Sequence, residues 1–252
     1  MRARHRLICD TLRPAQKLDD ATFLKAFLDV LGDHFALWTH GVHHRNLDFD
    51  VFKYSAVDGD ICGALVDHDI LSQRARADYG RAGQFMAFEL LRAAAYGGAR
   101  KGSYPLYRHD LEAFYMMLVW RCCCIGDDGN EQVGETLYRL TSCDYEECYY
   151  GRIWYERSAY DEREGLVHPS HQVLWVVAEA WTEDLEGRVR LRERRTRRDD
   201  VFEQDAQESW TRFCALLGLD GVRSQLEACG GEGAAVLRVI NQFLAGPRKP
   251  FV

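Results

Sequence analysis

Hydrophobic residues recur at helical spacing along most of this chain, so the sequence predicts a mainly helical protein. Between residues 21 and 39 the apolar positions fall on one side of a helix, which is expected to end at Gly41. These positions are Phe23, Phe27, Val30, Leu31, Phe35 and Trp38. Further helical patterns cover 84–98, 109–124, 170–187, 208–220 and 232–246.

Two short segments with strand character interrupt the helical pattern. Residues 51–56 and 61–69 are joined by Asp58-Gly59, a dipeptide that favours a tight hairpin turn. The segment 72–83 is charged and lacks periodicity, which predicts an exposed loop. Residues 134–160 are rich in tyrosine and acidic side chains and predict only a poorly defined helix.

Polar residues mark several expected helix starts. Asp19 and Asp20 precede the first helix, and Asp110 occupies the expected N-cap of the apolar helix near 109–124. In that helix one face is expected to carry the apolar side chains Leu111, Phe114, Met117 and Leu118. Ser170 is the expected cap of the helix that follows it. The glycine-rich stretch 229–233 predicts a helix end and a turn rather than a phosphate-binding loop.

Composition describes an ordinary globular protein. The 252 residues are 47% hydrophobic and 28% charged, and five prolines argue against long linkers. A net charge of −7 gives no overall attraction to nucleic acid or to an acidic membrane. The apolar run at 113–120 is too short to cross a bilayer, and no apolar signal segment follows the charged N-terminus. We therefore expect an intracellular protein of the cytoplasm or nucleus.

Nine cysteines in a chain without an export signal are expected to be reduced. The consecutive Cys122-Cys123-Cys124 end an apolar helix and are expected to act as small buried hydrophobic residues. Cys143 and Cys148 do not have the spacing of the usual zinc-binding pair. His168 and His171 would need cysteine partners from elsewhere in the chain, so a structural zinc site is not favoured.

Two polar stretches resemble protein-kinase motifs. His44-Arg45-Asn46 is similar to the His-Arg-Asp triplet of the kinase catalytic loop. After the predicted hairpin, "LVDHD" at 65–69 stands where kinases have the metal-binding Asp-Phe-Gly triplet, with Asp67 as the matching aspartate.

Two further stretches continue the same order. "FMAFELL" at 85–91 occupies the place of the Ala-Pro-Glu motif, with Glu89 as the matching glutamate. "HDLEAFYMMLVW" at 109–120 places Asp110 near the start of an apolar helix, as in the central helix of the kinase C-lobe. With "HRNLD" and "VDHD", these stretches resemble the fungal-type protein kinases in particular. Each motif alone is a weak signal, and the resemblance depends on their shared order.

The resemblance implies a fold and a chemistry. The fold is mainly α (α+β): a kinase-like C-lobe with a short β-hairpin at 21–125, between a basic tail at 1–20 and a helical continuation at 126–252. The family's reaction transfers phosphate from ATP to protein Ser or Thr hydroxyls with magnesium ions as cofactors. By the same resemblance Asp67 would hold magnesium, while Glu89 and Asp110 would have structural roles.

Two substitutions depart from the kinase pattern at the catalytic loop. Asn46 replaces the aspartate that accepts the hydroxyl proton, and an amide cannot accept a proton at neutral pH. Five residues later Val51 stands in place of the magnesium-binding asparagine, and its isopropyl group has no lone pair for a cation. Asp48 and Asp50 are expected to be solvated loop charges. The sequence therefore predicts a catalytically impaired pseudokinase that acts in protein binding.

The region before residue 44 shows no glycine-rich loop and no strand with a Val-Ala-Ile-Lys motif. We therefore expect the nucleotide-gripping N-lobe to be largely missing from this chain. The apolar face on which an N-lobe would dock would then favour self-association or a protein partner. The sequence does not identify that partner or a substrate, and it predicts no membrane insertion.

Two alternatives remain open at this point. The chain could be an active kinase completed by an N-lobe encoded elsewhere, which upstream genomic sequence would reveal. Alternatively, seven arginines within 188–198 could bind phosphate or nucleic acid. A solvated, charge-compensated segment is the favoured interpretation of this run, so nucleic-acid binding is not expected.

Overall fold

Helices make up most of the structure, a computed structural model that describes residues 12–44, 47–57, 59–66, 82–97, 106–192 and 202–246. The α-helices are α2 (Asp20–Thr39), α3 (Phe88–Ala95), α4 (Tyr107–Cys124), α5 (Tyr145–Arg157), α6 (Tyr160–Glu164), α7 (Gln172–Arg192), α8 (Phe202–Leu217), α9 (Asp220–Ala228) and α10 (Gly230–Ala245). The 3₁₀ segments are η1 (Ala15–Lys17), η3 (Ala82–Phe85), η4 (Tyr138–Thr141) and η5 (Pro169–His171). One antiparallel sheet contains β1 (Arg13–Pro14), β2 (Phe52–Val57) and β3 (Asp60–Leu65). The predicted mainly helical class with a short hairpin is confirmed.

Helix α2 forms where its periodic apolar pattern and its cap predict. Asp19 is the N-cap, and its side chain accepts a 3.0 Å hydrogen bond from the backbone N–H of Thr22. Phe23 and Phe27 are fully buried and pack edge-to-face against Phe52 of β2, with ring centroids 5.5 and 6.1 Å away. The apolar stripe of α2 therefore joins the helix to the small sheet.

The hairpin has the predicted turn. β2 and β3 pair antiparallel from Phe52↔Leu65 to Val57↔Asp60, and Gly59 in the turn has a φ of +85°, which glycine adopts without strain. Gly63 lies directly against α2, where any Cβ would overlap the carbonyl oxygen of Ala26. Close packing of the sheet on α2 therefore requires glycine at this position.

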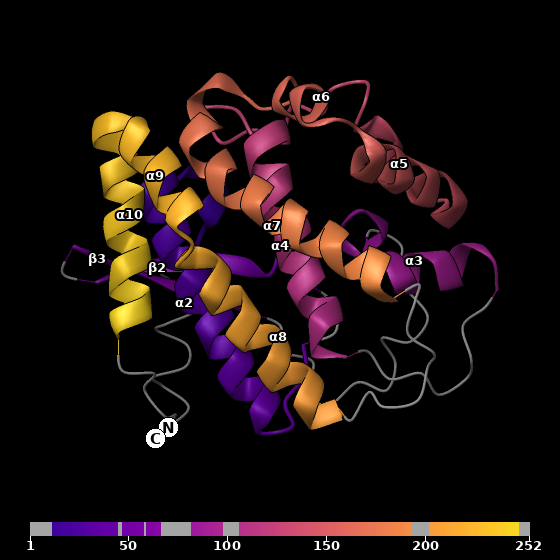
Figure 1. Ribbon diagram of the computed structural model, residues 1–252, viewed down its shortest axis with the longest axis horizontal. Helices are drawn as coiled ribbons and strands as arrows, with labels where there is room; N and C mark the ends of the chain where they lie inside the picture. Colours follow the sequence, from indigo (N-terminus) through magenta and orange to yellow (C-terminus); the bar gives the residue numbers. More distant parts are fainter. Residues whose placement is uncertain are drawn as a thin grey trace.

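Helix α4 runs through the middle of the molecule (Figure 1). It is buried on nearly every side rather than on the single predicted face, since Ala113, Tyr115 and Met116 are also buried. The expectation that Asp110 is an N-cap is wrong, because α4 begins at Tyr107 and Leu106 is its N-cap. Tyr107 to His109 extend the helix because their side chains are themselves buried against neighbouring elements.

The C-terminal half is helical, as predicted, with three differences in detail. Helix α5 is well formed, and its N-cap Asp144 accepts from the backbone N–H of Glu146 at 2.7 Å. Helix α9 was not predicted; it is short and joins α10 at Gly230, whose φ is +69°. Ser170 is not the cap of α7, because η5 precedes that helix and Ser170 donates its N–H to the His168 ring.

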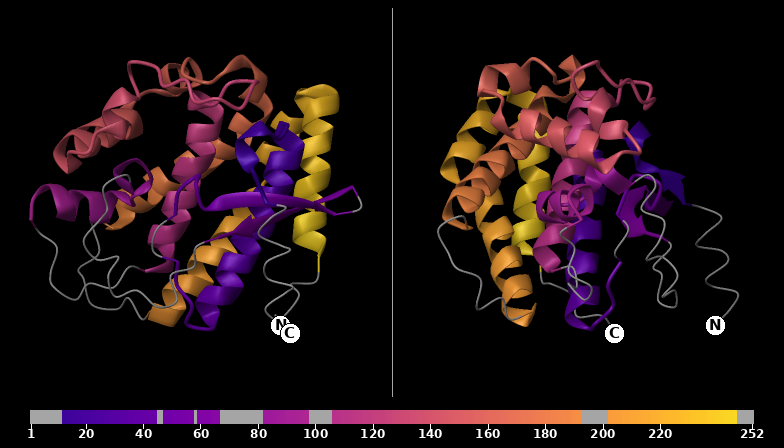
Figure 2. Two further views of the ribbon diagram at one scale, coloured as in Figure 1. Left: turned by 180° about the vertical axis from the view of Figure 1, so that it is seen from behind. Right: turned by 90° about the vertical axis from the view of Figure 1, so that its right-hand side faces the viewer.

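Two helical groups lie at opposite ends of the molecule. Helices α9 and α10 lie at one end, and α3 and α5 lie towards the other, as both Figure 1 and the reverse view in Figure 2 show. No helix among the described residues is long and apolar enough to cross a membrane. Cys122 and Cys124 are buried and Cys123 is half-buried, all three as free thiols, as predicted.

Candidate functional site

His44 links the polar turn after α2 to the end of β3. Its ring is 2% exposed, and its Nε2–H donates a 2.9 Å hydrogen bond to the carbonyl oxygen of Val66. Burial is the main cause that lowers the pKa of His44, because an imidazolium would lose solvation there. This contact brings the catalytic-loop-like stretch beside the residue that precedes Asp67. Arg45, Asn46 and Asp67 themselves lie outside the described residues.

The turn that follows is organised by Asp48. Its Oδ1 accepts hydrogen bonds from the backbone N–H of Asp50 at 2.8 Å and of Val51 at 3.1 Å. Asp48 is half-buried, and loss of solvation is the main cause that raises its pKa. Asp48 and Asp50 were both expected to be solvated loop charges. This prediction is correct for Asp50, which is exposed, and wrong for Asp48, whose carboxylate bonds the backbone of the turn.

Val51 is buried beside this turn. It is 5% exposed, its side chain has no lone pair, and its carbonyl oxygen already accepts the N–H of Val66 at 2.9 Å. A buried isopropyl group at the position that resembles a magnesium ligand fits a packing role. The residues present therefore do not fit a two-magnesium site of the kinase type.

Asp110 anchors α4 to α2. Its Oδ2 lies 2.9 Å from Nε2 of His34, and both side chains are buried. The rings of Tyr107 and Phe114 pack on the His34 imidazole, with centroids 5.5 and 5.2 Å away. Asp110 thus ties α4 to α2 through a histidine partner that the sequence did not reveal, and the family role that the resemblance implies for it stays a prediction.

Glu89 connects α3 to the start of α4. Its Oε2 lies 3.4 Å from both Nε2 of His109 and Nη2 of Arg108. The hydrogen bond from His109 is the largest cause that lowers the pKa of Glu89 to about 2. Arg108 also pairs with Asp205 of α8 at 2.7 Å, so this polar cluster joins three helices.

A second polar cluster was missed by sequence reasoning. Glu112, on the central helix α4, accepts from the backbone N–H of Phe88 at 2.6 Å and from Nη2 of Arg152 at 3.0 Å. Arg152, which is 1% exposed, also bonds Glu156 at 2.7 Å, and its guanidinium lies over the ring of Tyr115. The sequence does contain a signal for this cluster, because Glu112 lies in a largely apolar stretch of the helix. A carboxylate that is buried there needs a charged partner.

The histidines and cysteines that the sequence offers as zinc ligands bond to other groups. His171 bonds Asp20 at 2.7 Å and the carbonyl oxygen of Ile125 at 3.0 Å. The Cys148 thiol donates to backbone carbonyls, including that of Ser142 at 3.0 Å. Among the described residues no group of three or more His, Cys, Asp or Glu side chains is placed to hold a metal ion.

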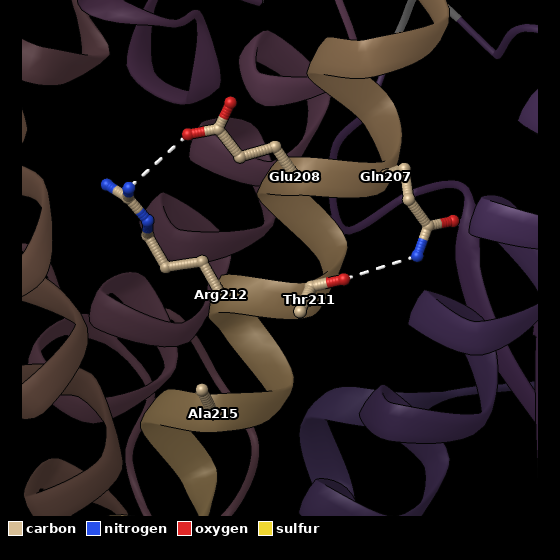
Figure 3. Close-up of a pocket in the computed structure, with 5 residues that line it drawn as sticks. All are labelled: Gln207, Glu208, Thr211, Arg212 and Ala215. Carbon is tan, nitrogen blue, oxygen red and sulfur yellow. Dashed lines mark hydrogen bonds and ion pairs between the residues drawn. The ribbon is translucent and has the colours of Figure 1, made fainter.

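A surface hollow of about 610 Å³ lies along one face of α8 (Figure 3). All of its lining residues come from that helix: Gln207, Glu208, Thr211, Arg212 and Ala215. Their polar groups pair along the helix, Arg212 with Glu208 at 3.4 Å and Gln207 with Thr211 at 3.2 Å. Because no second element among the described residues contributes a converging group, this hollow carries no candidate chemistry in the described part of the chain.

The arginine-rich run at 188–198 begins in the last turn of α7. Its side chains lie outside the described residues, so its predicted solvated state stays a prediction. No protein-family model, no curated protein and no solved structure matches this chain.

Proposed function

We propose that residues 21–125 form a lobe that resembles the C-lobe of fungal-type protein kinases, and that this chain acts as a protein-binding pseudokinase. The observation that carries the proposal is the His44–Val66 hydrogen bond, which joins the catalytic-loop-like stretch to the position just before Asp67. In kinases these two motifs face the same cleft. Helix α2, the hairpin, α3 and α4 follow one another in the order that the family's C-lobe requires.

The anchoring contacts support the same proposal. Glu89 and Asp110 occupy positions that resemble structural residues of the family. Glu89 pairs with Arg108 of α4, and the buried Asp110 contacts His34 of α2. Glu112, in the same "HDLEAF" stretch as Asp110, bonds the first residue of α3. Three acidic residues of the kinase-like motifs thus connect α2, α3 and α4 to one another.

Impaired chemistry follows from two positions. Asn46 offers an amide where proton acceptance is needed, and Val51 offers a buried isopropyl group where a magnesium ligand is needed. Loss of a positioned catalytic group commonly lowers the rate by about two to four orders of magnitude. In family members ATP supplies the phosphoryl group and magnesium neutralises its charge. In this chain only Asp67 would retain a metal-binding role.

A phosphoryl-transfer assay tests the proposal. The purified chain is incubated with γ-labelled ATP, magnesium and a mixed Ser/Thr peptide library, beside the Asp67→Ala variant. The expected result is the same background incorporation for both proteins. Incorporation by the wild-type chain that Asp67→Ala abolishes would contradict the proposal and support an active kinase.

A further inference from the structure

Several exposed aromatic side chains belong to η4, α5, α6 and the end of α3. Among the described residues seven large hydrophobic side chains are exposed, and five of them are aromatic. The aromatic ones are Tyr96 after α3, Tyr138 of η4, Tyr150 and Trp154 of α5, and Tyr160 of α6. Helix α5 packs against both α3 and η4, and the Tyr149 ring contacts both Tyr96 and Tyr150, so the side chains around α5 form an aromatic surface.

A groove of about 350 Å³ lies within this surface, between α5, the start of α6 and η4. Tyr150 and Trp154, which are 48% and 43% exposed, line it together with Arg139 and Arg157. Gly151 allows η4 to approach α5 closely, because a Cβ at this position would lie 3.0 Å from the Cβ of Arg139. The glycine therefore places Arg139 beside the aromatic residues.

The aromatic side chains of this surface are held in place. The Tyr149 ring stacks on Phe88 at a centroid distance of 5.1 Å and meets Tyr96 edge-on at 5.3 Å. A hydrogen bond with Tyr150 is the largest cause that raises the pKa of Tyr96 to about 12. These contacts restrict Tyr96, Tyr149 and Tyr150 before a partner arrives, which lowers the entropy cost of binding at those side chains.

Two arginines of the groove have no ion-pair partner among the described residues. Neither Arg139 nor Arg157 makes an ion pair or side-chain hydrogen bond with any residue that the structure describes. Arg152 on the same helix contrasts with them, because it is buried and paired with two glutamates. Glu162 also lines the groove, and its Oε2 accepts the N–H of Ala159 at 3.0 Å in the cap of α6, so two arginines and one glutamate give the lining a formal charge of +1.

We propose that this groove, here called the α5 groove, binds an acidic peptide segment of a partner protein. An apolar side chain of the peptide lies against Trp154 and Tyr150, and its carboxylates pair with Arg139 and Arg157. Aromatic residues and arginine dominate the energetics of protein interfaces, and guanidinium groups match carboxylates in geometry. An acidic peptide would be the partner in the protein-binding role proposed above. The groove itself is formed by α5, α6 and η4 and contains none of the kinase-like motif residues.

The test uses the full chain and a fluorescently labelled short peptide in which Asp and Glu flank a central Leu-Leu pair. Five of the six tryptophans are buried, so acrylamide quenching reports mainly on Trp154. We expect saturable binding by fluorescence anisotropy, protection of Trp154 from quenching, and an affinity that falls as salt rises. The Arg139→Glu/Arg157→Glu variant should bind at least about tenfold more weakly.

The matched control is Arg223→Glu/Arg238→Glu, which makes the same charge change on exposed residues of α9 and α10. It should bind like the wild-type chain, and cooperative melting of both variants shows that each is folded.

Equal binding of an Asn/Gln version of the peptide, or equal loss in both double variants, would overturn the proposal. So would a concentration-dependent dimer that Trp154→Ala dissociates, because the occupant would then be a second copy. Failure of this test leaves the ATP experiments unaffected, so the two proposals fail separately.

Discussion

The carboxylate of Asp110 lies 2.9 Å from the imidazole of His34, although the two residues are 76 positions apart in the sequence. The pair sits in the core between α2 and α4, enclosed by the rings of Tyr107 and Phe114. Removing one member of a buried polar pair leaves the other without its partner, which costs more than the pair contributes.

We expect Asp110→Ala to lower the free energy of unfolding by about 3 kcal/mol, because His34 would stay buried without its acceptor. Asp110→Asn should cost less, since an amide oxygen can still accept a hydrogen bond. Urea denaturation followed by circular dichroism measures both. Asp60→Ala, at an exposed aspartate of β3, is the control and should change little. A cost for Asp110→Ala no larger than that of the control would refute the anchoring role.

The Glu112–Arg152 pair makes a second, independent prediction. Arg152→Ala should destabilise the chain by about 3 to 5 kcal/mol, because Glu112 would lose a buried partner that ties α5 to α4. Glu112→Ala/Arg152→Ala should cost less than the sum of the two single changes. The measurement is a double-mutant cycle in urea. Arg157→Ala, on the exposed side of the same helix, is the matched control; additive costs would show that the pair is not coupled.

Glu89 predicts a specific dependence of stability on pH. The pKa of Glu89 is about 2 in the folded protein, whereas an unperturbed glutamate, as in the unfolded chain, has a pKa of 4.5. As pH falls, the unfolded state therefore binds the proton before the folded state does. The stabilisation is present above pH 4.5 and is lost as pH falls through 2. Because the side chain is 49% exposed, solvent screening limits the effect to about 1 kcal/mol or less.

The check compares melting temperatures of the wild-type chain and Glu89→Gln from pH 7 to pH 2. The wild-type chain should be the more stable at pH 7, and the difference should shrink between pH 4.5 and 2. A difference that stays constant across this range would mean that the Glu89 charge does not contribute. Glu164→Gln, at an exposed glutamate of α6, is a suitable charge-matched control.

Much of the architecture was predictable because it depends on local patterns. The bounds of α2 follow from an apolar stripe with an aspartate cap, and the hairpin follows from Asp58-Gly59 between two strand-like segments. These signals lie within a few residues of one another, so tertiary structure was not needed to interpret them.

The remaining features depend on distant contacts that a single sequence does not display. Asp110 looks like an N-cap from its neighbours, yet its partner is His34 on another helix. Arg152 lies in a tyrosine-rich stretch without clear periodicity, and only the fold brings it to Glu112. Of the candidate site, His44 and Val51 could be placed by the structure, while Arg45, Asn46 and Asp67 stay predictions because they lie outside the described residues.

A thermal-shift titration of the purified chain with ATP, with and without magnesium and beside Asp67→Ala, tests the central claim most directly. A ligand that binds only the folded state must raise the melting temperature. A pseudokinase with Val51 at the metal-ligand position should unfold cooperatively at the same temperature with or without magnesium and ATP. A magnesium-dependent rise that Asp67→Ala abolishes would contradict this account, because it would show that a working nucleotide site is present.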